Sequence, residues 1–279
     1  MLKPQRLTAI VDIGANPIDG NPVYTRMLNE GVCVVQGFEP NPIGLAKLEA
    51  KAGPNETYLD YAIGSGNSAR FFWRQASGMS GFLEEMSERS LETFPAFRAW
   101  SAITDAETME TKRLDDLALA GCDLIRMDVQ GSELDIIKAS PRTFAEAVMV
   151  MTEVSFVNLY THQPTFSQID IALRELGFIP HCFAEAKMWP IGNEKLGQPN
   201  QILEADMVYV KDYRMRGFTL EKWKHLAMLA HHIMGSYDLA MHCIRRIVEA
   251  EDGDIGDVSP DAAAQYRTIL RAADLVTDD

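Results

Sequence analysis

Carboxylates that end short apolar runs are the residues best suited to chemistry in this sequence. Asp12 lies near the end of the first run, two residues before a glycine that lets a ligand approach the backbone closely. Glu39 ends the second run, where a carboxylate can accept hydrogen bonds from both hydroxyls of a ribose. The third run ends at residues 60–64, whose apolar side chains could flank an adenine ring. The contacts expected for a nucleoside-containing cofactor are Asp12, Gly14, Ala15, Asn16, Glu39, Pro40, Asn41, Ala62 and Ile63.

The first turn also indicates which cofactor it binds. A dinucleotide fingerprint needs glycines that admit a pyrophosphate, but Asn16 replaces the second glycine and Asp19 stands where the third should be. A carboxylate there would repel a pyrophosphate. S-adenosylmethionine instead carries a sulfonium cation and an amino group, which Asp12, and Asp19 as well, would attract. The turn therefore favours S-adenosylmethionine, and the alternative is a tight turn that binds no ligand.

Two later carboxylates, Asp128 and Glu153, also end apolar runs and are expected to face the same crevice. An alcohol is a poor nucleophile until its proton leaves, so methyl transfer to a hydroxyl needs a base or a metal that acidifies the hydroxyl. Either carboxylate could be that base, and the two together could hold Mg²⁺. The alternative is that they cap helices or bind the cofactor. His162, in a following loop, is a third candidate base, although a loop histidine is more often merely exposed.

Apolar runs alternate with helix-like segments over the first 210 residues, the order expected of a mostly parallel sheet wrapped by crossover helices. Asn-Pro pairs at 21–22 and 41–42 mark helix starts, and Gly31 marks a helix end. Residues 69–73 are expected to add an edge strand, and the irregular segment 78–111 is expected to contain one helix at 85–97. The strands expected in the main sheet, roughly seven, are 8–12, 32–38, 57–63, 122–128, 148–154, 178–183 and 205–210.

The C-terminal segment has a different character. From residue 218 onward apolar side chains recur at helical spacing, which predicts α-helices. We therefore expect an α/β domain at residues 1–212 and a helical extension at 213–279, which covers the core or forms a homodimer contact. The histidines of this extension have no carboxylate or cysteine partners at ligand spacing, so no metal site is predicted there.

Composition narrows the class of partner and the location. The formal net charge of −14, from 40 acidic and 26 basic residues, would repel a phosphate backbone, so nucleic acid is not an expected partner. The four cysteines are widely spaced and form no CxxC pair, which indicates reduced thiols. No apolar run approaches the ~20 residues of a membrane span, and residues 7–13 are too short for a signal peptide. We expect a cytoplasmic protein without a membrane partner.

Over residues 8–211 the sequence resembles the FkbM family of S-adenosylmethionine-dependent methyltransferases. Six segments, in the family's order, carry the resemblance, which makes it far more specific than a single glycine turn. They are Val11–Asn16, Gly37–Asn41, Arg113–Asp116, Met127–Leu134, Thr152–Val154 and Glu204–Val210. The chain departs from many relatives at Gly81, where they have a second serine, which leaves the choice of acceptor open.

The resemblance implies a Rossmann-like, seven-stranded methyltransferase sheet with the turn at Gly14 and Glu39 at the cofactor. It also implies O-methylation of a small-molecule or carbohydrate acceptor such as a sugar, a polysaccharide precursor or a secondary metabolite. Asp128 and Gly131 match the family's D-V-x-G-x-E segment, and Glu153 matches its later acidic strand end. Two alternatives stay open: a nicotinamide-dependent oxidoreductase or epimerase, which predicts NAD binding, and a non-catalytic relative that binds a partner.

Overall fold

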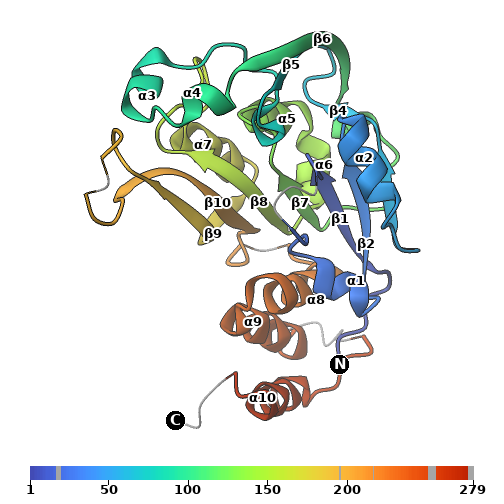
Figure 1. Ribbon diagram of the computed structural model, residues 1–279. Coiled ribbons are helices and arrows are strands. Elements are labelled where there is room, and N and C mark those ends of the chain that lie inside the picture. The colour runs from blue at the N-terminus through green and yellow to red at the C-terminus, as the bar shows by residue number, and fades with distance from the viewer. Residues whose placement is uncertain (17–19, 195, 216, 251–255, 276–279) are drawn as a thin grey trace. The chain divides into compact units, whose positions relative to one another are not determined.

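A computed structural model describes residues 1–16, 20–194, 196–215, 217–250 and 256–275. The chain divides into two compact units (Figure 1). The larger unit comprises Ala9–Asn21 and Val35–Lys211. The smaller unit comprises Met1–Thr8, Pro22–Val34 and Asp212–Asp279, so two N-terminal segments group with the C-terminal helices.

The main sheet has seven strands in the order β3-β2-β1-β7-β8-β10-β9. Strand β10 is antiparallel to both of its neighbours, whereas β2 and β3, β1 and β7, and β7 and β8 pair in parallel. This order confirms the predicted Rossmann-like, mostly parallel α/β sheet. The strands are β1 (Thr8–Ile13), β2 (Cys33–Phe38), β3 (Glu56–Leu59), β7 (Leu124–Met127), β8 (Met149–Ser155), β9 (Phe178–Trp189) and β10 (Gln201–Lys211).

The central strands were predictable because they are buried on both faces. Every residue of β1 and β8 is buried, so these strands appear in the sequence as continuous apolar runs. One face packs against α5 (Glu133–Ala139), α6 (Pro141–Glu146) and α7 (Phe166–Glu175), which contribute Ile136, Phe144 and Leu173 to the main core. Helix α7 begins with the predicted capping box of Thr165 and Gln168. Helix α2 (Pro42–Glu49) begins at the predicted Asn-Pro pair.

A second, three-stranded sheet was only partly predicted. It has the order β4-β6-β5, with β4 (Ala62–Ile63), β5 (Ser68–Arg74) and β6 (Ile103–Lys112). The predicted edge strand 69–73 is confirmed as β5, which lies at the edge of this second sheet and pairs with β6. Strand β6 was missed because it is polar and mostly exposed along its length.

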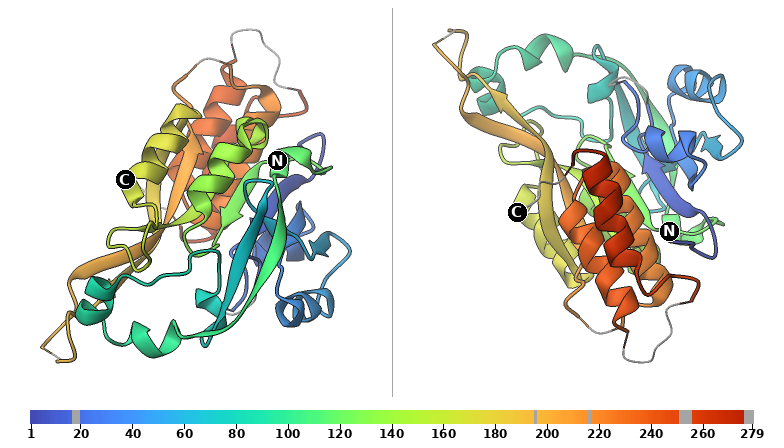
Figure 2. Two further views of the ribbon diagram at one scale, coloured as in Figure 1. Left: turned by 90° about the horizontal axis from the view of Figure 1, so that it is seen from above. Right: turned by 90° about the horizontal axis from the view of Figure 1, so that it is seen from below.

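The segment between β5 and β6 contains more than one helix. The single helix predicted at 85–97 is replaced by the short η1 (Ser77–Met79), α3 (Glu88–Thr93) and α4 (Phe97–Trp100). Strands β9 and β10 are both longer than predicted, and Figure 2 shows them running side by side as a long ribbon. The second half of β9 was missed because residues 183–186 are exposed and form no buried apolar run.

The smaller unit is helical, as predicted for its C-terminal part. Helices α8 (Leu220–Leu229), α9 (Tyr237–Val248) and α10 (Ala262–Ala272) lie next to one another, with a π-helical segment, Ala230–Met234, after α8 (Figure 2). Helix α1 (Thr25–Asn29) begins later than the predicted start at residue 22. No helix among the described residues is long and apolar enough to cross a membrane.

Candidate active site

A cavity of about 230 Å³ lies in the larger unit, at the carboxyl ends of β1, β2 and β7. This is where an open α/β sheet leaves a crevice for ligands. The predicted residues that line it are Gly14, Asn16, Glu39, Pro40, Asn41, Ala62, Ile63, Asp128 and Glu153. The fold therefore brings residues that are far apart in the sequence to the lining of one cavity.

The turn after β1 approaches two neighbouring strands closely. Gly14 has a φ of +74°, and the amides of Gly14 and Ala15 both donate to the Phe38 carbonyl, at 3.0 and 3.2 Å. A Cβ at Gly14 would overlap the backbone carbonyl of Asp128, so this position requires glycine for its space as well as its φ. Ala15 is not in the cavity lining, because its side chain packs against Leu48 and Tyr58. Asp19 lies outside the described residues.

Asp12 is buried behind the cavity and is not in its lining. Asp12 and Arg126 are register partners on β1 and β7, and the guanidinium donates to Asp12 Oδ1 at 3.1 Å. The same guanidinium donates to Asp128 Oδ2 at 3.2 Å and to the Gly14 carbonyl at 3.2 Å. Asp12 therefore orients Arg126, and Arg126 in turn holds Asp128 at the cavity. Direct contact of Asp12 with a cofactor stays a prediction.

Glu39 is a nearly fully buried carboxylate in the cavity lining. Burial raises the pKa of Glu39 to about 7, although hydrogen bonds from the amides of Asn41 and Asn16 oppose the shift. The Asn41 amide donates to Glu39 Oε1 at 2.7 Å. The side chain of Asn41 meanwhile caps α2 by accepting from the Ile43 amide at 2.9 Å. The start of α2 thus positions Glu39.

The turn that carries Asp128 is stabilised by hydrogen bonds to Glu133. The sequence analysis did not predict Glu133 as a functional residue. Glu133 Oε1 accepts from the amides of Val129 at 3.1 Å and Gly131 at 3.3 Å. This turn contains two positive φ angles, +54° at Gln130 and +96° at Gly131. Burial raises the pKa of Glu133 to about 7 despite these amide donors. The glutamate of the D-V-x-G-x-E segment therefore stabilises the turn.

We expect Glu133→Gln to change how stability depends on pH. Between pH 4.5 and about 7 the folded protein holds a proton on Glu133 that the unfolded chain has released, so stability falls as pH rises. The amide cannot ionise and can still accept from both backbone amides. The free energy of unfolding of the variant relative to wild type should rise by up to about 3 kcal/mol between pH 4.5 and 8. Urea unfolding at several pH values measures this, and a difference independent of pH would contradict it.

A second ion-pair group lines the cavity beside Asp128. The Lys187 ammonium lies 3.1 Å from Glu153 Oε2 and 3.2 Å from Glu204 Oε1. Burial and the neighbouring Glu204 raise the pKa of Glu153 well above its usual value, and burial raises the pKa of Glu204. Lys187 was missed because the predicted strand ended at residue 183. Glu204 lies in one of the family segments, which was the available signal.

Part of the lining is aromatic. Phe71 and Trp73 on β5, Phe82, and Phe97 on α4 all line the cavity. The Phe71 ring meets those of Trp73 and Phe82 in edge-to-face contacts, with centroids 4.7 and 5.0 Å apart. These side chains come from the segment that departs from the family at Gly81, and sequence reasoning did not predict them as site residues. The neighbouring residues Ser77, Gly78, Met79 and Ser80 also line the cavity, whereas Gly81 does not.

Arg74 holds this aromatic segment in place. Its guanidinium donates to three backbone carbonyls, those of Leu83 at 2.6 Å, Glu84 at 2.8 Å and Ser101 at 2.5 Å. It also lies over the Tyr160 ring, 5.2 Å from the centroid. An arginine that satisfies three carbonyls fixes an irregular segment that has little secondary structure of its own.

His162 is the one predicted catalytic residue that the structure does not bring to the cavity. Its side chain is exposed, its φ is +66°, and it is not in the cavity lining. Asp128 and Glu153 do line the same cavity. A role for His162 as the base stays a prediction.

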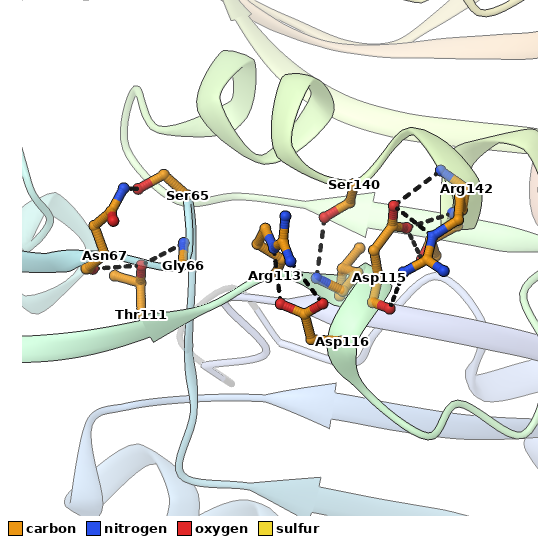
Figure 3. Close-up of polar contacts among 11 residues, drawn as sticks. Ser65, Gly66, Asn67, Thr111, Arg113, Asp115, Asp116, Ser140 and Arg142 are labelled. Atoms are coloured by element: carbon orange, nitrogen blue, oxygen red, sulfur yellow. Dashed lines mark hydrogen bonds and ion pairs between the residues drawn. The ribbon is translucent and has the colours of Figure 1, made fainter.

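The segment Arg113–Asp116 stabilises the fold away from the cavity (Figure 3). Arg113 forms a two-pronged pair with Asp116, at 2.7 and 2.8 Å. Asp115 accepts from the amide of Thr143 at 2.7 Å and from that of Arg142 at 3.1 Å, in the first turn of α6. The Leu114 amide donates to Ser140 Oγ at 3.0 Å. This segment contains the short η2 (Leu114–Asp116), and its hydrogen bonds to the start of α6 give it a structural role.

The described residues contain no group of three or more histidine, cysteine, aspartate or glutamate side chains that could hold a metal ion. Asp128 and Glu153 instead each pair with a cation of the protein, Arg126 and Lys187. None of the four cysteines, all of which are described, forms a disulfide.

Comparisons with known proteins place the chain in a family. Residues 12–180 match the methyltransferase FkbM domain. The 2-O-methyltransferase NoeI of Sinorhizobium fredii is 28% identical over 167 residues, which cover 55% of this chain and 66% of NoeI. The chain thus spans just under two thirds of the length of this relative.

Two solved structures are distantly similar. Methyltransferase FkbM from Methylobacillus flagellatus is 14% identical, with a TM-score of 0.40, and the match covers 73% of this chain and 43% of that protein. Magnesium protoporphyrin IX methyltransferase from Synechocystis, solved with S-adenosylmethionine bound, is 11% identical, with a TM-score of 0.38, and the match covers 74% and 71%. The resemblance to this family is confirmed by the domain match over more than half of the chain, although the last of the six segments, Glu204–Val210, lies beyond the matched residues. This chain belongs to the methyltransferase FkbM domain family.

Proposed function

We propose that this protein transfers a methyl group from S-adenosylmethionine to a hydroxyl of a sugar-like acceptor. One observation carries the proposal: a single cavity is lined by Glu39 and the Gly14 turn, by the two carboxylates of Asp128 and Glu153, and by several aromatic side chains. We call these aromatic side chains the aromatic wall; they are Phe71, Trp73, Phe82 and Phe97. NoeI is a 2-O-methyltransferase, which supports the choice of oxygen as the methylated atom.

The residues present fit S-adenosylmethionine better than a dinucleotide. The described cavity lining carries four carboxylates, on Glu39, Asp128, Glu153 and Glu204, and one ammonium, on Lys187. Burial raises the pKa of Glu39, Glu153 and Glu204 and so reduces this negative charge, but an excess of acidic side chains still favours a sulfonium cation over a pyrophosphate. Glu39, a buried carboxylate beside the Gly14 turn, would hold the ribose hydroxyls, and Ala62 and Ile63 would flank the adenine. When bound, S-adenosylmethionine supplies an activated methyl group on sulfur.

The remaining chemistry is to remove the proton of the acceptor hydroxyl. Asp128 and Glu153 are the carboxylates placed to accept it. Asp128 already accepts a hydrogen bond from the Arg126 guanidinium, whereas burial raises the pKa of Glu153. A base with a raised pKa holds a transferred proton better, so we assign proton acceptance to Glu153 and orientation of the hydroxyl to Asp128.

The acceptor class is proposed from the aromatic wall. Phe71, Trp73, Phe82 and Phe97 offer apolar ring faces and edges, and the carboxylates of the same lining can accept hydrogen bonds from hydroxyls. A sugar ring presents both kinds of surface, with C–H groups on its faces and hydroxyls around its edge. Because Asp128 and Glu153 have cation partners within the protein, we do not propose them as Mg²⁺ ligands.

We expect micromolar binding of S-adenosylhomocysteine and no binding of NAD, with or without Mg²⁺, in calorimetric titrations. Glu39→Ala should weaken this binding by about 1–3 kcal/mol, because it removes a charged hydrogen-bond acceptor. Glu49→Ala, at an exposed position at the end of α2 and outside the cavity lining, is the control and should bind as wild type. Binding of NAD instead would favour an oxidoreductase, and no binding of either would favour a non-catalytic relative.

Transfer itself is tested by incubating the protein with radiolabelled S-adenosylmethionine and neutral sugars, oligosaccharides and small alcohols. Label in a sugar hydroxyl supports the proposal, and label only in amines or thiols would contradict it. A homodimer through the helical extension and a cytoplasmic location stay predictions. Sedimentation velocity tests the first, and cell fractionation tests the second.

A further inference from the structure

Lys187 is a charged residue in the cavity lining that the proposed function has not used. Its ammonium lies between two carboxylates, 3.1 Å from Glu153 Oε2 and 3.2 Å from Glu204 Oε1. The lysine side chain is 32% exposed, whereas those of Glu153 and Glu204 are 5% and 15% exposed. Glu153 is therefore the more buried of the two carboxylates, and the Lys187 ammonium is its cationic partner.

The sheet order explains how one lysine reaches both carboxylates. Lys187 on β9 and Glu204 on β10 are direct register partners across two antiparallel strands. Glu153 lies on β8, on the other side of β10, so the lysine side chain crosses β10 to reach it. This crossing fixes the direction of the Glu153 carboxylate, because Oε2 accepts a hydrogen bond from Lys187.

Charged groups from four elements face Glu153. Glu204 on β10, Asp128 after β7 and Glu133 in α5 raise the pKa of Glu153 in addition to burial, and Lys187 on β9 lowers it. A nearly buried carboxylate among three other carboxylates would be protonated and unable to accept a proton. Lys187 is the group that opposes this.

We infer that Lys187 is a positioning residue: its ammonium holds the Glu153 carboxylate in the cavity lining and favours the ionised form that can accept the acceptor's hydroxyl proton. This inference rests on the proposed function. As the acceptor oxygen bonds to the methyl carbon, that carbon's bond to sulfur breaks with its electron pair left on sulfur, and the hydroxyl proton passes to Glu153. Lys187 keeps its own protons throughout and acts only through Glu153.

Two substitutions should move the same quantity in opposite directions. Lys187→Met removes the ammonium and should raise the pKa of Glu153 by about 1–3 units. Glu204→Gln removes the neighbouring negative charge and should lower it, because Lys187 then pairs with Glu153 alone. Lys187→Arg keeps the charge and should stay near wild type. Lys51→Met, the same change at an exposed lysine outside the cavity lining, is the matched control.

The pKa of Glu153 is read from the carboxyl ¹³C resonance of labelled protein, saturated with S-adenosylhomocysteine, as pH is varied. The resonance is assigned with Glu153→Gln. Once an acceptor is in hand, the pH at which kcat rises should shift in parallel, upward in Lys187→Met and downward in Glu204→Gln. Thermal unfolding checks that each variant is folded, and if Lys187→Met fails to fold, the downward shift in Glu204→Gln carries the test.

The outcomes separate this inference from the proposed function. If wild type does not bind S-adenosylhomocysteine, the proposed function fails. If wild type binds it and transfers methyl groups, but neither variant moves the Glu153 titration or the pH profile, Lys187 has no positioning role. A shift in the control Lys51→Met would attribute the effect to total charge and would also overturn the inference.

Discussion

Replacing Glu153 by Gln is expected to lower kcat for methyl transfer by about 10²- to 10⁴-fold, the usual contribution of a positioned base. The amide has nearly the same size and can still hydrogen-bond, but it cannot take up the hydroxyl proton. Glu153 lies with Lys187 and Glu204 in a cluster distinct from the Glu39 turn, so affinity for S-adenosylhomocysteine should change by only about threefold. Steady-state kinetics with labelled S-adenosylmethionine, beside calorimetry, separates the two effects.

Asp128→Asn and His162→Ala are the comparisons for this experiment. Asp128→Asn weakens the ion pair with Arg126 and should lower kcat less than Glu153→Gln, because orientation of the hydroxyl is only partly lost. His162 is exposed and outside the cavity lining, so His162→Ala should retain wild-type kcat if Glu153 is the base. Full activity in Glu153→Gln, together with a large loss in either of the others, would move the base to that residue.

Gly14→Ala is expected to lower the affinity for S-adenosylhomocysteine by about 100-fold and the free energy of unfolding by about 2–4 kcal/mol. The new Cβ would meet the Asp128 carbonyl, so the turn after β1 and the turn after β7 must separate. A φ of +74° adds strain for any residue with a side chain. Calorimetry and urea unfolding measure the two effects.

Gly31→Ala is the matched control, because it separates strain from overlap. Gly31 has a similar φ, +66°, but a Cβ there would meet nothing within 4 Å. We expect Gly31→Ala to lower the free energy of unfolding by about 1 kcal/mol and to bind S-adenosylhomocysteine as wild type. If both variants behave alike, the overlap with Asp128 is not the cause.

The cofactor turns were predictable because their chemistry depends on neighbouring residues. Gly14 follows a fully buried strand, and Glu39 is positioned by the helix that the Asn41-Pro42 pair starts. Both features are visible in a few consecutive letters. The same reasoning predicted Asp12 as a cofactor contact, which stays a prediction, but it did not reveal that Asp12 accepts a hydrogen bond from Arg126. The sequence shows that Asp12 lies near a strand end, but it does not show which residue the Asp12 side chain contacts.

The aromatic wall and Lys187 were missed for a different reason. Strand β6 and the middle of β9 are exposed and carry polar residues, so hydrophobic periodicity does not reveal them. Without β6, the segment that carries Phe71, Trp73, Phe82 and Phe97 had no place in the fold. Without the outer half of β9, Lys187 had no strand to place it.

The sequence by itself determined the family, the parallel core and the residues of the glycine and Glu39 turns, because buried strands and tight turns depend on local residue types. Only the tertiary structure decided which charges meet. Asp12 and Arg126 are 114 positions apart, and Lys187 and Glu153 are 34 apart, yet each pair is joined by an ion pair. Strand order and register create these contacts, and with them the pKa of the carboxylate assigned as the base.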